Sequence, residues 1–269
     1  MVGSATAEAP LLRADEGGVA LLRLNRPAAR NALSVALLDA LAEALAAIGA
    51  DRAVRAVVLA ANGPAFCAGH DLRELTAARE APDGGAAFFA DTMARCAAVM
   101  QAVAALPQPV IAAVRGMATA AGCQLVASCD LAVAGDRASF CTPGVSIGLF
   151  CSTPAVALTR AVPQKAAMEM LLTGDIIDAA EARRIFLVNR VVADGNEEAE
   201  ALRLAHGIAA RSAAAVRIGK RAVREQLGRG LADAYASASA AMVENLLCRD
   251  AAEGIGAFLT RRAPVWEDR

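Results

Sequence analysis

Short apolar runs and longer amphipathic runs alternate through the first half of the chain. Residues 54–61 (VRAVVLAA) and 110–114 (VIAAV) are rich in β-branched residues, which favour strands. Residues 34–49 and 86–106 carry apolar residues at the spacing of one helix face, and Pro107 stops the second run. Such alternation predicts a parallel sheet with helices packed on its faces. Further strands are predicted at residues 19–24 and 131–134.

The pattern changes near residue 194. From Glu197 onward the sequence predicts helices only, with breaks near Arg211 and at residues 228–230. We therefore expect two parts, an α/β core over residues 1–194 and a helical region over residues 195–269. The second part is too short and too amphipathic to bury its apolar faces alone. It should pack on the core or on another subunit.

Composition and charge exclude several classes of function. The net charge of −1 and the aromatic content of 3% argue against nucleic-acid binding, which needs a basic surface and stacking platforms. No apolar run is long enough to predict a membrane span. Two histidines and no CxxC pair argue against a metal site. Seven cysteines, with no secretory signal in residues 1–10, predict a cytoplasmic protein with reduced thiols.

Residues 62–75 (NGPAFCAGHDLREL) follow a predicted strand that ends at Ala61, and they predict a Gly/Pro turn and the start of a helix. Asp71 and Glu74 have the spacing of a capping box. The backbone N–H groups near His70 would then lie at a helix N-terminus, where they can bind a developing negative charge. An ordinary strand-to-helix turn explains the same residues.

Residues 115–130 (RGMATAAGCQLVASCD) lead from a strand, through small residues, into an apolar segment of helical spacing. Small side chains let a ligand approach the backbone closely. The N–H of Ala121 is a candidate for a second donor, and two donors aimed at one oxygen make an oxyanion hole. Gln124 has an alternative role as a buried amide that ties its helix to a neighbour.

Residues 144–148 (GVSIG) match the GxSxG pattern of a serine hydrolase, with Ser146 as nucleophile. That motif needs a strand before the serine and a helix directly after it. Here Pro143 and Pro154 flank the match, and the only remote partner is His206. The serine hydrolase therefore stays a remote alternative.

Five stretches, in chain order, resemble the signatures of the crotonase superfamily, also called the enoyl-CoA hydratase/isomerase family. They are residues 24–33 (LNRPAARNAL), 65–75 (AFCAGHDLREL), 112–140, 172–192 and 250–266. The resemblance implies a crotonase-like ββα superhelix core followed by a C-terminal helical trimerisation region. It implies assembly as a homotrimer or a dimer of trimers. It also implies a role in fatty acid metabolism, with an acyl-CoA thioester as ligand and no cofactor beyond the coenzyme A of the substrate.

The resemblance also assigns residues. The thioester oxygen would lie between the backbone N–H groups of His70 and Ala121. Cys151 and Ser152 would lie near the acyl group. Coenzyme A would contact Arg26, Arg30, Ala32, Ala68, His70, Asp71, Leu72 and Arg73, and Phe258, Arg261 and Arg262 would help to close a site, in this subunit or a neighbour.

The sequence departs from the family where its hydratases carry two glutamates. Gln124 and Gly144 occupy those positions, and a neutral amide cannot take a proton as a carboxylate does. We therefore expect weak or no hydration of ordinary enoyl-CoA substrates. An enzyme of the lyase or isomerase type that stabilises an enolate, with the His70 side chain as one candidate base, and a non-catalytic acyl-CoA-binding protein both remain open.

Overall fold

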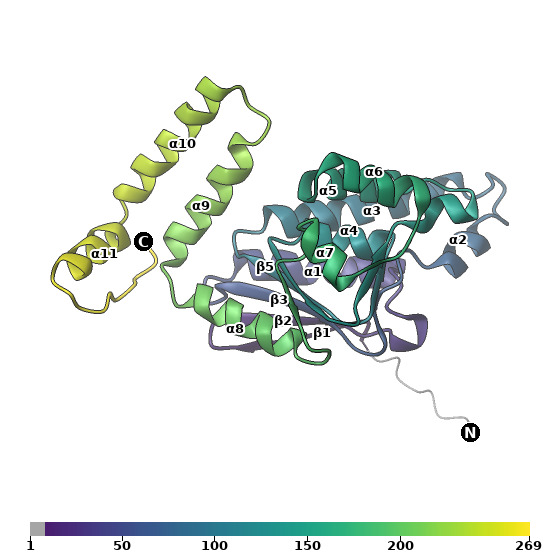
Figure 1. The fold of residues 1–269 in the computed structure, drawn as a ribbon, viewed down its shortest axis with the longest axis horizontal. Coiled ribbons are helices and arrows are strands. Elements are labelled where there is room, and N and C mark those ends of the chain that lie inside the picture. Colours follow the sequence, from purple (N-terminus) through teal and green to yellow (C-terminus); the bar gives the residue numbers. More distant parts are fainter. Residues whose placement is uncertain (1–8) are drawn as a thin grey trace.

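The computed structural model describes residues 9–269, and they form a layered α/β core from which a helical arm projects (Figure 1). The first sheet has the strand order β1-β2-β3-β5-β7-β10. All neighbours are parallel except β1 and β2, which are antiparallel. The predicted parallel sheet is thus confirmed. Its strands are β1 (Leu11–Glu16), β2 (Val19–Leu24), β3 (Ala56–Ala61), β5 (Val110–Val114), β7 (Leu131–Gly135) and β10 (Arg190–Val192).

A second, separate sheet has four short strands. Its order is β4-β6-β8-β9, formed by Ala65–Cys67, Met117–Thr119, Ser139–Cys141 and Ile177–Asp178. Strands β3, β5 and β7 each continue into a strand of this sheet and then into a helical segment. The repeated strand–strand–helix unit is the ββα superhelix expected from the resemblance, so the predicted fold class is confirmed.

Helices cover both faces of the first sheet. The α8 helix (Glu197–Ala209) lies along one face, where Ala201, Ala205 and Ala209 pack against Val58 and Ile111. These alanines recur every four residues and form one flat helix face. The other helices of the core are α1 (Val35–Ala50), α2 (Leu72–Ala78), α3 (Ala86–Ala105), α4 (Ala121–Ser128), α5 (Ser152–Ala161), α6 (Gln164–Thr173) and α7 (Ala179–Arg184), with 3-10 turns η1 (Pro27–Ala29) and η2 (Pro143–Ile147).

The arm comprises residues 213–269 and extends away from the core (Figure 1). It contains α9 (Ala213–Gln226), α10 (Leu231–Leu246) and α11 (Arg249–Leu259). The breaks predicted near Arg211 and at 228–230 are confirmed. Several large apolar side chains of the arm face solvent, among them Leu231, Leu247 and Phe258, at 77%, 82% and 83% exposure. An apolar surface of this kind marks an interaction site.

No helix within residues 9–269 is long and apolar enough to cross a membrane. Residues 1–8, where the sequence was searched for a secretory signal, lie outside the described part of the chain.

Candidate active site

His70 lies in the turn between β4 and α2, where a single parallel bridge joins it to Leu33. The Leu33 N–H donates to the Gly69 carbonyl (2.7 Å), and the Asp71 N–H donates to the Leu33 carbonyl (3.2 Å). Because both groups that flank His70 face Leu33, the N–H of His70 faces the opposite edge of the chain. That N–H has no acceptor among the described residues. The turn therefore presents one unpaired backbone donor.

Asp71 begins helix α2, as the sequence predicts. Its carboxylate accepts the Arg73 N–H (3.1 Å) and pairs with the Arg26 guanidinium (2.9 Å). Burial alone would raise the pKa of Asp71, but the hydrogen bonds from Arg26 and the backbone outweigh it, and the pKa lies below its usual value. Glu74 does not return to its own helix start. Its Oε2 instead accepts the N–H of Val35 (3.0 Å), the first residue of α1. The predicted capping box is therefore only half right.

Ala121 is the first residue of α4, and Ala120 alone separates it from the end of β6. The preceding Ala120 has φ 50° and ψ −116°, a conformation that costs about 1–3 kcal/mol for a residue with a side chain. The Ala120 N–H donates to the Cys141 carbonyl (2.9 Å), whereas the Ala121 N–H has no acceptor within residues 9–269. The first N–H groups of any helix lack partners inside that helix. This turn therefore presents a second unpaired donor.

Two glycines bring these turns together. A Cβ at Gly69, where φ is +85°, would lie 3.0 Å from the Ala120 Cβ and 3.4 Å from the Ala121 nitrogen. A Cβ at Gly122 would lie 2.2 Å from the Cys67 carbonyl oxygen. Only glycine permits backbones to approach so closely. The turns that carry the two unpaired N–H groups are consequently in direct contact.

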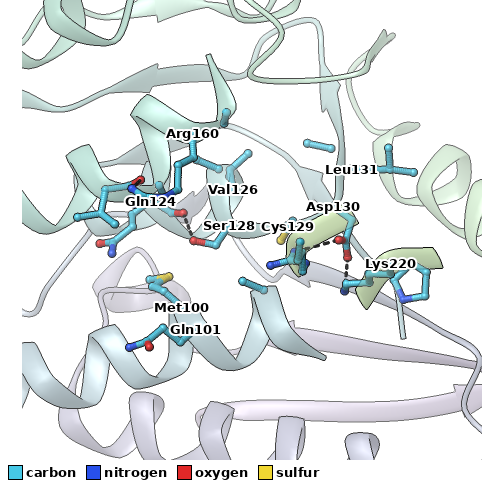
Figure 2. A pocket seen from close by; sticks show the side chains of 18 of the residues that line it. Met100, Gln101, Gln124, Val126, Ser128, Cys129, Asp130, Leu131, Arg160 and Lys220 are labelled. Carbon is cyan, nitrogen blue, oxygen red and sulfur yellow. Dashed lines mark hydrogen bonds and ion pairs between the residues drawn. The ribbon is translucent and has the colours of Figure 1, made fainter. Parts of the chain in front are cut away.

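Gln124 lies one turn into α4 and is 4% exposed. Its side-chain Oε1 is buried and has no hydrogen-bond partner among the described residues. The residue lines one end of a cavity of about 950 Å³ between α3, α4, α5 and α9. Figure 2 shows Gln124 at that end, beside Ser128 and opposite Met100 and Gln101 of α3, with Asp130 and Lys220 at the other end. A buried amide oxygen without a partner is costly, so a hydrogen-bond donor at this end of the cavity would be stabilised by Gln124.

Gly144 is buried in η2, where an added side chain would be crowded. A Cβ there would lie 2.9 Å from the Cys151 Sγ and 3.1 Å from the Leu149 carbonyl oxygen. Burial raises the pKa of the Cys151 thiol, although a hydrogen bond from the Gly144 backbone opposes this. The neutral thiol therefore occupies the space that a longer residue at position 144 would need. Ser152, the next residue, is the exposed first residue of α5.

The His70 side chain is the only imidazole of this region within the described residues. Burial lowers the pKa of His70, so the ring is neutral at neutral pH. Its Nε2 is buried and has no hydrogen-bond partner in residues 9–269. A neutral ring can accept a proton, but this nitrogen does not open to solvent.

The residues predicted to contact coenzyme A fall into two groups. Arg26, Ala32 and Asp71 are joined directly, because Arg26 donates to the Ala32 carbonyl and pairs with Asp71. The Ala68 N–H donates to the Arg30 carbonyl (3.0 Å), and Leu72 and Arg73 follow on the exposed start of α2. The second group comprises Phe258, Arg261 and Arg262, which lie in or just after α11. Figure 1 shows α11 on the arm, at the opposite end of the molecule from α2.

The serine hydrolase motif lacks the geometry it needs. Ser146 lies inside the 3-10 turn η2 and is exposed, with no strand leading directly into it. His206 lies in α8, where its ring approaches Gly17. The structure therefore does not form the strand–serine–helix turn of that motif.

Asp130 organises contacts that sequence reasoning missed. Its carboxylate accepts the Val110 N–H (2.8 Å), Lys220 Nζ (2.5 Å) and Arg224 Nη2 (3.1 Å). The two cations belong to α9, at least 90 positions further along the chain, so local patterning carried no signal for them. They hold the base of the arm against the core at one wall of the cavity. Among residues 9–269, no group of His, Cys, Asp and Glu side chains is arranged to hold a metal ion.

Known proteins resemble this chain in sequence and in fold over most of its length. The family model described as enoyl-CoA hydratase/isomerase matches residues 14–269. A rat relative named enoyl-CoA hydratase domain-containing protein 3, mitochondrial, is 47% identical over 93% of this chain and 82% of its own length. The crystal structure of an enoyl-CoA hydratase from Mycobacterium smegmatis has a TM-score of 0.92 and 50% identity, covering 96% of this chain and 99% of its own. That of human enoyl-CoA hydratase domain-containing protein 3 has a TM-score of 0.91 and 45% identity, covering 96% and 100%.

The predicted cytoplasmic location is wrong by this comparison. The relatives from rat, mouse and human, each 47% identical, are all named as mitochondrial proteins. The prediction rested on cysteine usage and on a search for a secretory signal alone. Neither observation separates the cytoplasm from another reducing compartment.

Proposed function

The chain belongs to the enoyl-CoA hydratase/isomerase family, and from that premise we propose that it binds an acyl-CoA or enoyl-CoA thioester. The thioester oxygen accepts hydrogen bonds from the backbone N–H groups of His70 and Ala121. Coenzyme A itself passes along residues 68–73 and 30–32. Such paired donors stabilise the negative charge that develops on the oxygen when the thioester becomes an enolate.

One observation carries this proposal. Two turns from different parts of the chain, each with an unpaired backbone N–H, are packed against each other through Gly69 and Gly122. Ala120 holds a strained backbone conformation at the same place. Strain of this kind persists where the surrounding structure requires it, and it concentrates at functional sites.

The same site lacks acid–base groups at the two positions where hydratases of the family carry glutamates. Gln124 orients a substrate or a water molecule by hydrogen bonding but does not exchange a proton with it. Gly144 offers backbone only, and Cys151 fills the adjacent space as a neutral thiol. General acid–base catalysis contributes about 10²–10⁴-fold to rate. Hydration of ordinary enoyl-CoA esters is therefore slow, and the main chemical contribution is polarisation of the thioester.

Non-catalytic binding of acyl-CoA is the second candidate, and the packing at Gly144 favours it. With the Cys151 thiol beside Gly144 in place of a second glutamate, the site can still bind a thioester but has no carboxylate there to transfer a proton. Chemistry through the enolate requires another base. The candidate is the imidazole of His70, whose lowered pKa leaves the ring neutral.

The arm supports self-association as a homotrimer or a dimer of trimers. Its exposed apolar side chains need a partner surface. Phe258, Arg261 and Arg262 lie in or just after α11, away from the α2 turn of the same chain (Figure 1). They therefore complete a coenzyme A site of a neighbouring copy. We retain the division into residues 1–194, which bear the site, and 195–269, which serve assembly, with α8 as the element that joins them.

Binding and turnover of one panel of saturated and 2-enoyl CoA esters test the proposal. We expect the esters to bind. Hydration of the enoyl members should be at least about 10²-fold slower than in a family hydratase that carries both glutamates. Binding without any turnover selects the non-catalytic candidate, and turnover lost in His70→Ala selects the imidazole as base. Failure of every CoA ester to bind would overturn the proposal itself.

A further inference from the structure

The loop between β2 and α1 is built around Arg26, whose guanidinium is mostly enclosed. Arg26 Nη2 lies 2.9 Å from Asp71 Oδ2, and Nη1 donates to the Ala32 carbonyl. The exposed fractions of the Arg26 and Asp71 side chains are 26% and 11%. Two of the five guanidinium N–H donors are therefore committed to the protein itself. The Arg26 side chain therefore stabilises this loop whether or not a ligand is bound.

Asp71, whose carboxylate pairs with Arg26, directly follows His70 in the chain. The Asp71 N–H donates to the Leu33 carbonyl (3.2 Å), and the Asp71 Oδ1 accepts the Arg73 N–H (3.1 Å). On the other side of His70, the Gly69 carbonyl accepts from Leu33 (2.7 Å). The peptide groups on either side of His70 are therefore both anchored. The direction of the His70 N–H is set by these anchors, because this N–H and the Gly69 carbonyl belong to one planar trans peptide unit and point in opposite directions.

A second set of bonds fixes the loop from which Arg26 acts. The buried Asn31 accepts the Arg26 N–H (2.8 Å) and donates to the carbonyls of Asn62 and Ala65 (2.8 Å each). Glu74 joins α2 to the start of α1 through Val35. Arg26 and the β4 strand are consequently held in one frame, with Asp71 between them. These hydrogen bonds restrict rotation of the turn that contains His70.

We infer that Arg26 is a positioning residue for the oxyanion donor: its ion pair with Asp71 keeps the His70 N–H aimed at the thioester oxygen. The inference rests on the proposed function, and it replaces a coenzyme A contact as the role of the Arg26 and Asp71 side chains, while coenzyme A still passes along the backbone of residues 68–73. Hydrogen bonds weaken steeply as the angle at the hydrogen closes. A small rotation of the turn therefore weakens the bond to the oxygen while coenzyme A still binds.

The test uses butyryl-CoA labelled with carbon-13 at the thioester carbonyl, whose infrared band moves to lower frequency when donors polarise it. The full-length protein is compared with Arg26→Gln, Arg26→Lys and Asp71→Asn. Asp71→Asn is nearly isosteric and keeps an acceptor for the Arg73 N–H, so it serves if Arg26→Gln does not fold. Arg13→Gln is the matched control, because Arg13 pairs with Asp15 on the edge strand β1, away from this turn. Dissociation constants for free coenzyme A are measured alongside.

We expect Arg26→Gln and Asp71→Asn to lose about half or more of the wild-type band shift, with partial recovery in Arg26→Lys and no change in Arg13→Gln. Affinity for free coenzyme A stays within about twofold in every variant. A full band shift in both Arg26→Gln and Asp71→Asn overturns the inference. So does a loss of affinity for free coenzyme A equal to that for butyryl-CoA, which would make Arg26 a ligand contact. An absent band shift in the wild-type complex would instead defeat the proposed function.

Discussion

Gly122 is the point at which helix α4 approaches strand β4 most closely, so Gly122→Ala tests the packing that creates the site. A Cβ at this position would lie 2.2 Å from the Cys67 carbonyl oxygen and 2.8 Å from the Cys67 carbonyl carbon and Cβ. Contacts of that length with backbone atoms cannot be relieved by a side-chain rotation. The helix must move away from the strand, and the Ala121 N–H at its start must move with it.

Overpacking a well-filled core costs about 1–3 kcal/mol, and a clash with backbone belongs at the upper end, about 3 kcal/mol. For a domain of this size, each kcal/mol corresponds to about 2–4 °C in Tm. We therefore expect Gly122→Ala to lower Tm by about 6–12 °C. Binding of a CoA thioester should weaken further, because the two donors no longer converge on one oxygen.

Gly207→Ala is the matched control, since Gly207 lies in helix α8 and a Cβ added there would meet nothing within 4 Å. The same substitution there should stabilise the protein by about 0.5–1 kcal/mol, because alanine favours a helix over glycine. Thermal unfolding and calorimetric titration with butyryl-CoA are measured for both variants. A Gly122→Ala protein with the Tm and thioester affinity of Gly207→Ala would refute the close approach of α4 to β4.

Four further outcomes follow from the site. Gln124→Glu should speed hydration of a 2-enoyl-CoA by about 10-fold or more, because it restores a proton-transfer group, and should cost about 1–3 kcal/mol in urea unfolding, because the site is buried. Gly144→Glu should unfold at lower urea concentration, and adding Cys151→Gly should recover part of that loss, since the thiol is the nearest of the crowding atoms. The pKa of Asp71 is lower in the folded state than in the unfolded state. Ionised Asp71 should therefore stabilise the fold fully above its unfolded pKa of about 4, and this stabilisation should be lost as pH falls through the folded pKa. Urea unfolding measured at several pH values should show this pH dependence in the wild type and not in Asp71→Asn. A fluorophosphonate should leave Ser146 unlabelled by mass spectrometry, and labelling would restore the hydrolase.

The main sheet could be predicted from sequence because each of its central strands is a buried apolar run. Val110–Val114 is buried at every position, and such runs are typical of parallel strands covered on both faces. Strand β1 was not predicted, since five of its six residues are exposed at the sheet edge. Strands β4, β6, β8 and β9 span two or three residues each. A segment that short has no periodicity to detect.

The donor turns were also predictable, because Gly69, Gly122 and the small residues before Gln124 stand out locally. Their partners were not. Glu74 caps α1 instead of α2, and Arg26 pairs with Asp71 across 45 positions. The closure of Gly144 by Cys151 depends on how a 3-10 turn folds back on a helix start. Contacts of this kind are set by tertiary packing, which local spacing does not encode.

The most direct measurement of the central claim compares the affinities of butyryl-CoA and its thioether analogue, which lacks only the carbonyl oxygen. Two backbone hydrogen bonds to that oxygen contribute about 1–3 kcal/mol in total, so the thioester should bind about 5- to 150-fold more tightly than the thioether. The ratio should fall towards one in Gly122→Ala. Equal affinities of the wild-type protein for the two compounds would contradict the account, because the carbonyl would then not lie between His70 and Ala121.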